Sequence, residues 1–198
     1  RLWGFTKEMP GVPATPDTSE LQAARNLVNY RRIILEPGPS GAGQAGLAQK
    51  GMWIDVGSFS KGYCADRAIE VLKRHGIRSA LVAAGGTICT IGTKPDGMPW
   101  KVAVRHPRKD DYLTFVPLVD ASISTSGDYE RYYRKGGKRR GHIIDPRTGT
   151  PVERMQSVSV IAKTGMETDG LDTALFVLGP KEGLQLVEKL PGISALVI

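Results

Sequence analysis

Apolar residues recur at helical spacing in four segments of the chain. In the first of them, Leu21, Leu27 and Val28 share one helical face. Gly76 follows the second segment and favours termination there, and Thr168 opens the third as a candidate N-cap. The predicted helices cover residues 18–29, 65–75, 168–178 and 181–190.

Six other segments are predicted to be strands, because their apolar residues alternate with polar ones or form short buried runs. These strands cover residues 31–35, 79–84, 100–105, 112–119, 157–162 and 194–198. Between them, residues 38–51 are rich in glycine and alanine and are predicted to form a mobile surface loop, either a lid or a tolerated insertion.

The order of these elements predicts an α+β fold rather than a doubly wound one, since strands and helices do not alternate in a regular βαβ rhythm. The 198 residues, of which 40% are hydrophobic, can bury one sizeable core. We therefore expect a single domain over residues 1–198. No apolar run approaches the roughly 18 to 20 residues that span a bilayer.

Two cysteines are present, Cys64 and Cys89, and they lack the spacing of a zinc or redox site. One potential pair does not fix the redox compartment. Both side chains are predicted to lie in the core.

The net charge of +7 comes largely from one segment, because residues 131–140 hold six cations and no acid. Without them the charge falls to roughly +1. With Tyr132 and Tyr133 beside it, such a hairpin can track a nucleic-acid backbone, but no nucleic-acid-binding signature accompanies it. The pattern favours a solvated hairpin near an anionic ligand, and no nucleic acid is expected as a partner.

Residues 141–151 combine a histidine, a carboxylate and a turn in one short run. Pro146 fixes φ and Gly149 relaxes the chain, so a sharp turn is predicted that holds His142 and Asp145 at a strand end. Such a run is either part of a functional site or an ordinary tight turn between strands.

Two glycine-containing segments suit close approach of a ligand to the backbone. Ser126 and Gly127 belong to a hydroxyl-rich run, and Gly85 and Gly86 follow a predicted strand. Glycine leaves room for an anionic ligand, and hydroxyls and amides can bind it. Either pair alone is also compatible with an ordinary turn.

The predicted helix over residues 168–178 gathers hard oxygen ligands. Asp169 lies three and four residues before Asp172 and Thr173, so the three side chains share a helix face. Carboxylates and a hydroxyl, without histidine or cysteine, favour Mg²⁺ over zinc. The alternative is that both aspartates only favour the helix N-terminus electrostatically.

A further segment, residues 55–67, runs from a strand end through a Gly/Ser-rich loop into a helix. Together with the Gly85-Gly86 pair, the hydroxyl-rich run, the His142-to-Pro151 run and residues 167–179, in this order and spacing, it resembles the ApbE family, the FAD:protein FMN transferases. The resemblance extends over nearly the whole chain, from Leu2-Trp3-Gly4-Phe5 to the last strand. It implies layered mixed sheets with packed helices, related to tunnelling folds. Family members also carry an N-terminal portion and a short C-terminal tail that this chain lacks.

The resemblance also implies the residues of a site. In the family, a backbone carbonyl three residues after the aspartate that opens the Gly/Ser loop is a metal ligand. Here that carbonyl belongs to Ser58, where the family commonly has glycine, and a backbone ligand should tolerate the change. The implied metal ligands are Ser58, Asp169, Asp172 and Thr173, and the implied FAD contacts are Asp55, Lys61, Gly85, Gly86, Ser126, Gly127 and Ile144.

The reaction implied by the family is Mg²⁺-dependent transfer of FMN from FAD to a Ser or Thr hydroxyl of an acceptor protein. His142 is the candidate general base, with Asp145 orienting either it or the turn. Hydrolysis of FAD, or FAD binding without turnover, are the alternatives. The resemblance further implies acceptors in electron-transfer complexes and a location outside the cytoplasmic membrane. The only expected membrane contact is a lipid anchor outside this chain.

Overall fold

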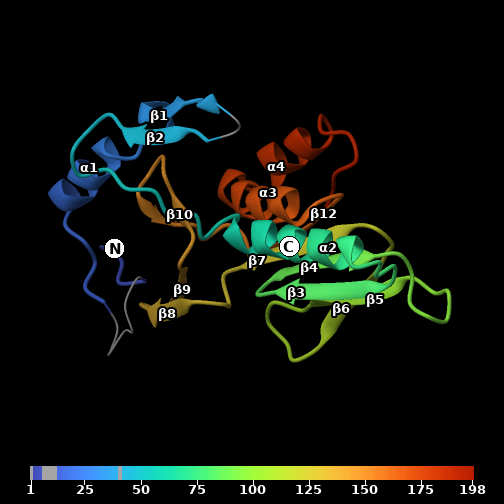
Figure 1. Ribbon diagram of the computed structural model, residues 1–198. Coiled ribbons are helices and arrows are strands. Elements are labelled where there is room, and N and C mark those ends of the chain that lie inside the picture. Colours follow the sequence, from blue (N-terminus) through green and yellow to red (C-terminus); the bar gives the residue numbers. More distant parts are fainter. Residues whose placement is uncertain (1, 6–12, 40–41) are drawn as a thin grey trace.

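A five-stranded antiparallel sheet forms the centre of the computed structural model, which describes residues 2–5, 13–39 and 42–198 (Figure 1). Its strand order is β13-β12-β7-β4-β3. The mixed α+β class predicted from the sequence is confirmed. The strands are β3 (Ala80–Ala84), β4 (Thr87–Ile91), β7 (Ser122–Gly127), β12 (Ser157–Ala162) and β13 (Ser194–Val197).

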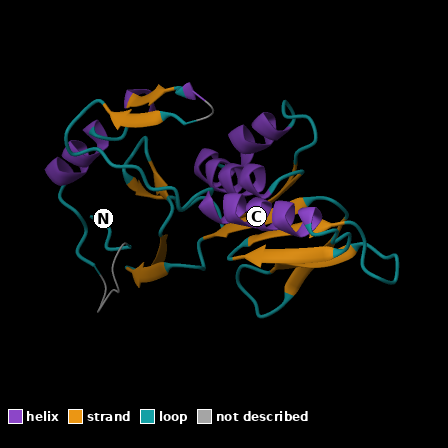
Figure 2. Cartoon of the chain, viewed as in Figure 1, coloured by secondary structure: helices purple, strands orange, loops and turns teal. Residues whose placement is uncertain are grey.

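Helices cover one face of this sheet, and a two-stranded sheet covers the other. Ala65 and Ile69 of α2 pack against Cys89 and Ile91 of β4, whereas Ile123 of β7 packs on the opposite side. That opposite layer is the pair β5 (Trp100–Arg105) and β6 (Tyr112–Leu118). The helices are α1 (Thr18–Asn26), α2 (Ser60–Arg74), α3 (Gly165–Leu178) and α4 (Pro180–Val187), with a 3-10 turn at Tyr30–Arg32 (Figure 2). In the described part of the chain, none of the helices combines the length and apolar character needed to cross a membrane.

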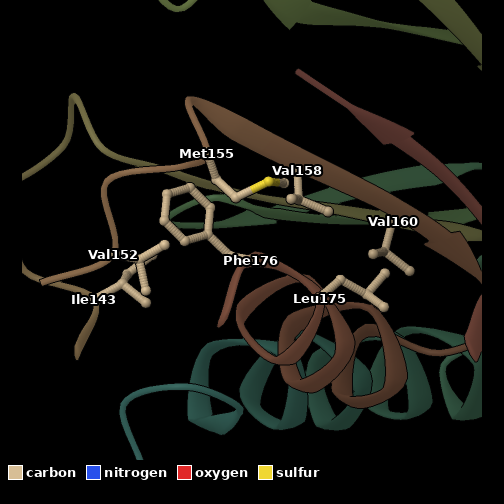
Figure 3. Close-up of a cluster of buried hydrophobic side chains, with 7 residues drawn as sticks. All are labelled: Ile143, Val152, Met155, Val158, Val160, Leu175 and Phe176. Atoms are coloured by element: carbon tan, nitrogen blue, oxygen red, sulfur yellow. The ribbon is translucent and has the colours of Figure 1, made fainter. Parts of the chain in front are cut away.

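The largest buried cluster lies between β12 and α3 (Figure 3). Val158 and Val160 lie on the same face of β12 and contact Leu175 and Phe176 of α3. All four side chains are at most 1% exposed. Full burial of such side chains is worth about 1.5–3 kcal/mol each. This packing fixes α3 over the middle of the sheet.

Three short hairpins complete the structure. They are β1 (Ile33–Glu36) with β2 (Gln44–Leu47), β8 (Tyr132–Lys135) with β9 (Lys138–Gly141), and β10 (Ile144–Asp145) with β11 (Thr150–Pro151). The second is the basic hairpin expected over residues 131–140. The third contains the predicted sharp turn, in which Gly149 has a φ of 75°.

The N-terminal third departs most from the sequence prediction. Residues 38–51, expected as a loop, contain β2, although Ser40 and Gly41 lie outside the described residues. The helix predicted over residues 18–29 ends at Asn26, and it buries none of its residues; Val28, placed on its apolar face, is 60% exposed. Figure 1 shows α1 and the β1–β2 hairpin at one side of the molecule, away from the large sheet.

The predicted starts of the second and third helices are also wrong. The second helix begins at Ser60, five residues before the predicted start, and so includes Lys61. Thr168 is not an N-cap: Thr164 accepts the hydrogen bond from the Glu167 N–H and forms a capping box with that residue. Thr168 is fully buried inside the first turn and donates to the Gly165 carbonyl at 2.9 Å.

Two strands of the large sheet, β4 and β7, were absent from the sequence prediction. The run from Ser122 to Gly127, part of which was interpreted as a turn, is the central strand β7. The Ser122 hydroxyl donates to Cys89, which packs against α2, and the Ser126 hydroxyl donates to Asp172 of α3. The helix-facing side of β7 therefore carries no apolar signal.

The two cysteines differ in environment. Cys89 is 2% exposed, as expected of a core residue, and burial raises the pKa of its thiol to about 11. Cys64 is exposed, so its predicted core position is wrong.

Helices α2 and α3 touch through their backbones. A Cβ on Gly62 of α2 would overlap the Gly165 carbonyl of α3, and one on Gly165 would lie 2.8 Å from the Gly62 carbonyl oxygen. Both positions therefore require glycine, and the close approach brings the start of α2 to the start of α3.

Gly62→Ala is expected to destabilise the protein by roughly 1–3 kcal/mol or more, because the two backbones must separate to admit a methyl group. Gly170→Ala on α3 is the matched control, since a Cβ there meets nothing closer than the Phe59 Cβ at 4.0 Å. It should leave stability unchanged or raise it by about 0.5–1 kcal/mol. Urea unfolding measures both, and equal effects would contradict the assigned contact.

Candidate functional site

Asp169 lies where α3 meets the start of α2, and it is 2% exposed. Its Oδ2 accepts a hydrogen bond from the Gly62 N–H at 2.9 Å, and its Oδ1 lies 2.8 Å from the Lys61 ammonium. Lys61 also donates to the Gly57 carbonyl at 2.7 Å. The extended start of α2, which the sequence prediction missed, is what brings Lys61 and Gly62 to this carboxylate.

Asp172, one turn further along α3, faces the central strand and is 1% exposed. Its Oδ1 accepts hydrogen bonds from the Ser126 hydroxyl at 2.8 Å and the Thr173 hydroxyl at 3.0 Å. The Ser126 and Thr173 oxygens are 3.1 Å apart. Two carboxylates and two hydroxyls thus gather in a polar site between α2, α3 and β7.

Burial raises the pKa of Asp172 to about 6, and the nearby Asp169 adds to this effect. Hydrogen bonds from Ser124, Ser126 and Thr173 act in the opposite direction, but they do not cancel the cost of removing the carboxylate from water. The site therefore holds more negative charge than its own groups stabilise.

This donor set fits a hard divalent cation. Asp169, Asp172 and Thr173, predicted as ligands, occur together in the structure, and a cation would offset the burial that raises the pKa of Asp172 and the smaller effect of Asp169. No group of three His, Cys, Asp or Glu side chains suited to a metal occurs within the residues described. The predicted set contains only two such side chains, because its other ligands are a hydroxyl and the carbonyl of half-buried Ser58. The ligand assignment stays a prediction.

The glycines predicted to contact FAD surround the same site. A Cβ on Gly85, in the turn between β3 and β4, would lie 2.8 Å from the Lys61 side chain. One on Gly86 would lie 2.9 Å from the Thr125 carbonyl, next to Ser126 on β7. These residues, distant in sequence, are brought together by the pairing of β4 with β7.

Three more residues predicted to contact FAD lie on the loop before α2, at the end of β7 and on β10. Asp55 accepts a hydrogen bond from the Gly57 N–H at 2.8 Å and so fixes the loop whose Gly57 carbonyl holds Lys61. Gly127 ends β7, and the ring of Tyr129 occupies the space where its Cβ would lie. Ile144 is half-buried on β10, opposite Pro151.

Asp66 has a structural role that sequence reasoning did not assign. Its carboxylate accepts hydrogen bonds from the first two N–H groups of α3, those of Gly165 at 2.7 Å and Met166 at 2.9 Å. A carboxylate at a helix N-terminus is favourable. Asp66 therefore ties α2 to the helix that carries Asp169 and Asp172. Its only sequence signal was its helical position, six residues after Ser60, which does not show that its partner is another helix.

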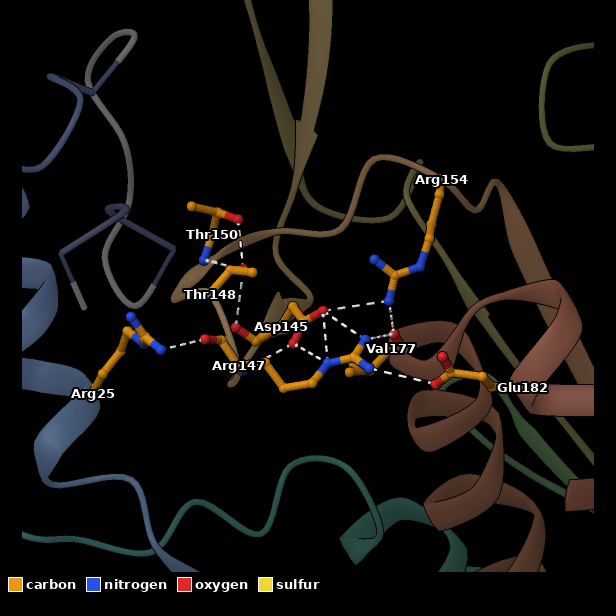
Figure 4. A network of polar contacts seen from close by, with 8 residues as sticks. All are labelled: Arg25, Asp145, Arg147, Thr148, Thr150, Arg154, Val177 and Glu182. Carbon is orange, nitrogen blue, oxygen red and sulfur yellow. Dashed lines mark hydrogen bonds and ion pairs between the residues drawn. The ribbon is translucent and has the colours of Figure 1, made fainter.

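Asp145 stabilises its turn through two arginines (Figure 4). Arg147 donates from its backbone N–H at 2.9 Å and pairs through Nη2 at 2.8 Å, and Arg154 lies at 3.3 Å. Hydrogen bonds from Arg147 lower the pKa of Asp145 to about 2. Arg154 also donates to the Val177 carbonyl near the end of α3. Of the two roles expected for Asp145, these contacts correspond to organising the turn.

His142 follows the basic hairpin, and its backbone N–H donates to the Arg131 carbonyl at 3.0 Å. Burial lowers the pKa of its imidazole, and the positive charge of Lys61 contributes to that shift. Its Nδ1 is buried and has no hydrogen-bond partner among the described residues. The ring of Phe5 meets it edge-on at 6.5 Å. His142 is thus a neutral base within electrostatic reach of Lys61.

Known proteins are similar to this chain over nearly its whole length. The family model described as "ApbE family" matches residues 1–197. The FAD:protein FMN transferase of Treponema pallidum is 37% identical over 213 aligned residues, which cover 100% of this chain and 58% of that protein. One from Klebsiella pneumoniae is 36% identical, covering 95% and 54%. The chain therefore spans little more than half the length of these relatives.

Solved structures show the same fold. The ApbE protein of Thermotoga maritima superposes with a TM-score of 0.88 at 33% identity, covering 100% of this chain and 63% of that one. The flavinyl transferase ApbE of Pseudomonas stutzeri, in its apo form, gives a TM-score of 0.81 at 36% identity, with coverages of 99% and 59%.

Asp172→Asn is expected to stabilise the protein at about pH 7.5 in the presence of a chelator, by about 3 kcal/mol. A raised carboxyl pKa means that the bound proton stabilises the folded state below about pH 4, and that this contribution is lost as the pH rises through about 6. The advantage of the variant should thus shrink near pH 4.5. Urea unfolding at both pH values tests this, and a less stable variant at the higher pH would show that the carboxylate is stabilising.

Proposed function

Because this chain belongs to the ApbE family, we propose that the protein transfers FMN from FAD to a Ser or Thr hydroxyl of a second protein and releases AMP. The observation that carries the proposal is the buried oxygen site at the junction of α2, α3 and β7. Two carboxylates with one cationic partner, Lys61, are costly to bury in a protein that only needs to fold. Their cost is understandable if they bind a cation and, through it, a phosphate ester.

Asp169, Asp172, Thr173 and the Ser58 carbonyl are the residues that would hold Mg²⁺. The ion, when bound, supplies positive charge that stabilises the phosphate oxygens as negative charge develops on them. Lys61 adds a second positive charge beside the same site. The residues that would contact the FAD substrate are Asp55, Lys61, Gly85, Gly86, Ser126, Gly127 and Ile144.

The transfer step breaks one bond and forms one. The acceptor hydroxyl oxygen attacks the FMN-side phosphorus of FAD, and the bond from that phosphorus to the bridging oxygen breaks, so AMP leaves with the bridging oxygen. His142 takes the hydroxyl proton. A lowered imidazole pKa keeps His142 neutral, and so able to accept a proton, at neutral pH.

The acceptor class and the cellular location are supported by the family resemblance. On that basis we propose acceptors in electron-transfer complexes and a site of action outside the cytoplasmic membrane. These proposals do not depend on the chemistry of the oxygen site.

Asp169→Ala is expected to lower Mg²⁺-dependent AMP release from FAD by at least about 10²-fold, since it removes a ligand and leaves Lys61 without its partner. The assay uses the full-length protein with an acceptor, and reads AMP by chromatography and covalent flavin by in-gel fluorescence. Asp96→Asn, in an exposed turn, is the control and should leave both signals unchanged.

The outcomes separate the alternatives. Acceptor-dependent AMP with a fluorescent acceptor band supports the transferase. AMP without a band, for every acceptor tried, would indicate FAD hydrolysis instead. FAD binding without AMP release would indicate a carrier, and unchanged release by Asp169→Ala would reject the metal ligand.

His142→Gln is expected to slow transfer by about 10²–10⁴-fold and to alter its pH dependence. The wild-type rate should fall at a pH below the usual histidine pKa of about 6.5, because burial lowers the pKa of His142 and only its neutral form can act as a base. The variant should lack this acidic limb. An unchanged pH profile of kcat/KM in the variant would assign the limb to another group.

A further inference from the structure

Residues 2–5, with the sequence Leu-Trp-Gly-Phe, have no role in the proposed reaction. We call them the aromatic segment. The side chain of Trp3 is 7% exposed, and its Nε1–H donates to the Gly149 carbonyl at 2.7 Å. Gly149 lies in the turn between β10 and β11. Trp3 therefore attaches the aromatic segment to the turn that follows His142 and Asp145.

Phe5, the last residue of the aromatic segment, contacts two other rings. It stacks on Tyr133 of β8, with the ring centroids 5.6 Å apart and the planes inclined by 27°. It meets the imidazole of His142 edge-on, with the centroids 6.5 Å apart and the planes inclined by 69°. Both distances are within the range of about 4.5–7 Å that is usual for aromatic contacts. Phe5 therefore packs His142 against the basic hairpin.

Tyr133 supports Phe5 from a buried position. It is 7% exposed, and its hydroxyl is buried without a hydrogen-bond partner in the part of the chain that the structure describes. A buried hydroxyl without a partner costs free energy. The ring of Tyr133, and not its hydroxyl, is therefore the part that stabilises this contact.

No hydrogen bond from the described residues orients the Nδ1 of His142, although this nitrogen is buried. In many catalytic histidines, a hydrogen bond to one ring nitrogen orients the other. Asp145, the nearest candidate for that role in the sequence, pairs with Arg147 and Arg154 instead. Packing against Phe5 is then the contact that can hold the imidazole in place.

We propose that Phe5, supported by Tyr133, positions the imidazole of His142 for proton transfer and excludes water from its Nδ1. This inference rests on the proposed function, in which His142 takes the proton of the acceptor hydroxyl. Phe5 and Tyr133 are positioning residues, because they act through His142 and not on the substrates. A base displaced by about 1 Å can lower a rate by about 10²-fold, so such packing affects catalysis.

The first variant is Phe5→Leu in the full-length protein, assayed with FAD, Mg²⁺ and an acceptor protein. Leucine keeps the position apolar but removes the ring that meets the imidazole. We expect kcat to fall by about 10- to 10²-fold while the KM for FAD stays unchanged. Phe115→Leu is the matched control, because Phe115 also lies 5.6 Å from a tyrosine ring, that of Tyr112, on β6. It should leave both constants unchanged.

The pH profile of kcat/KM separates positioning from a loss of folded protein. The charges that act on His142 are those of Lys61, Arg131 and Glu130, and Phe5→Leu leaves all three in place. Burial lowers the pKa of His142, so water admitted by the variant should raise this pKa toward its usual value. The acidic limb of the profile should therefore move to higher pH. A smaller folded fraction would lower the rate without moving the limb in this way.

Two variants of Tyr133 separate the ring from the hydroxyl. Tyr133→Leu removes the stacking on Phe5 and should lower kcat and move the acidic limb in the same directions as Phe5→Leu. The conservative variant Tyr133→Phe should restore the wild-type values, because the hydroxyl has no partner among the described side chains and backbone groups. A loss in Tyr133→Phe as large as in Tyr133→Leu would assign the effect to the hydroxyl and overturn the role of the ring.

Combining Phe5→Leu with His142→Gln shows whether Phe5 acts through the histidine. Once the base is absent, Phe5→Leu should cause little further loss of rate. An equal loss in both backgrounds, or an acidic limb that does not move in the single variant, would overturn the inference. If the wild-type protein labels no acceptor, the proposed transfer itself fails, and this result is distinct from normal labelling by Phe5→Leu, which overturns the positioning role alone.

Discussion

The burial of two carboxylates, Asp169 and Asp172, is the constraint on which the rest of the structure depends. A charge removed from water costs several kcal/mol unless hydrogen bonds and counter-charges offset it. The Gly62 N–H and Lys61 do so for Asp169, and the Ser126 and Thr173 hydroxyls for Asp172. These contacts require the backbones of α2 and α3 to touch and a central strand with serines toward the helices. Asp66 at the start of α3 strengthens the junction.

The same constraint connects stability to function. Asp172 has a raised pKa because its hydrogen-bond partners do not fully compensate for burial of the carboxylate. A divalent cation would supply the compensating positive charge. The functional elements around the site are held by separate means. Asp145 and its two arginines stabilise the turn that follows His142, while the pairing of β4 with β7 brings the Gly85-Gly86 turn to Ser126. The site is thus assembled from segments that each have their own structural support.

Much of the fold could be predicted from apolar periodicity, whereas the site residues were predicted from helical spacing and the family resemblance. Periodicity located β3, β5, β6, β12, β13 and most of α2, α3 and α4, because each has a clear apolar face. It missed β7, whose helix-facing side is serine, and it could not show that Gln44–Leu47 pairs with β1, since small residues carry little strand signal. Helical spacing placed Asp169, Asp172 and Thr173 on one face of α3, and the structure brings them together, while their role as metal ligands stays a prediction. The contacts of Asp66 with the start of α3 depend on tertiary packing, which the local pattern does not encode.

The most direct test of the central claim is the position of a divalent cation in crystals of the full-length protein grown with Mn²⁺, located by its anomalous scattering. The account predicts a peak bound by oxygens of Asp169, Asp172 and Thr173, with the Lys61 ammonium displaced from Asp169. A structure with no peak at this junction, and with Lys61 still paired to Asp169, would contradict it.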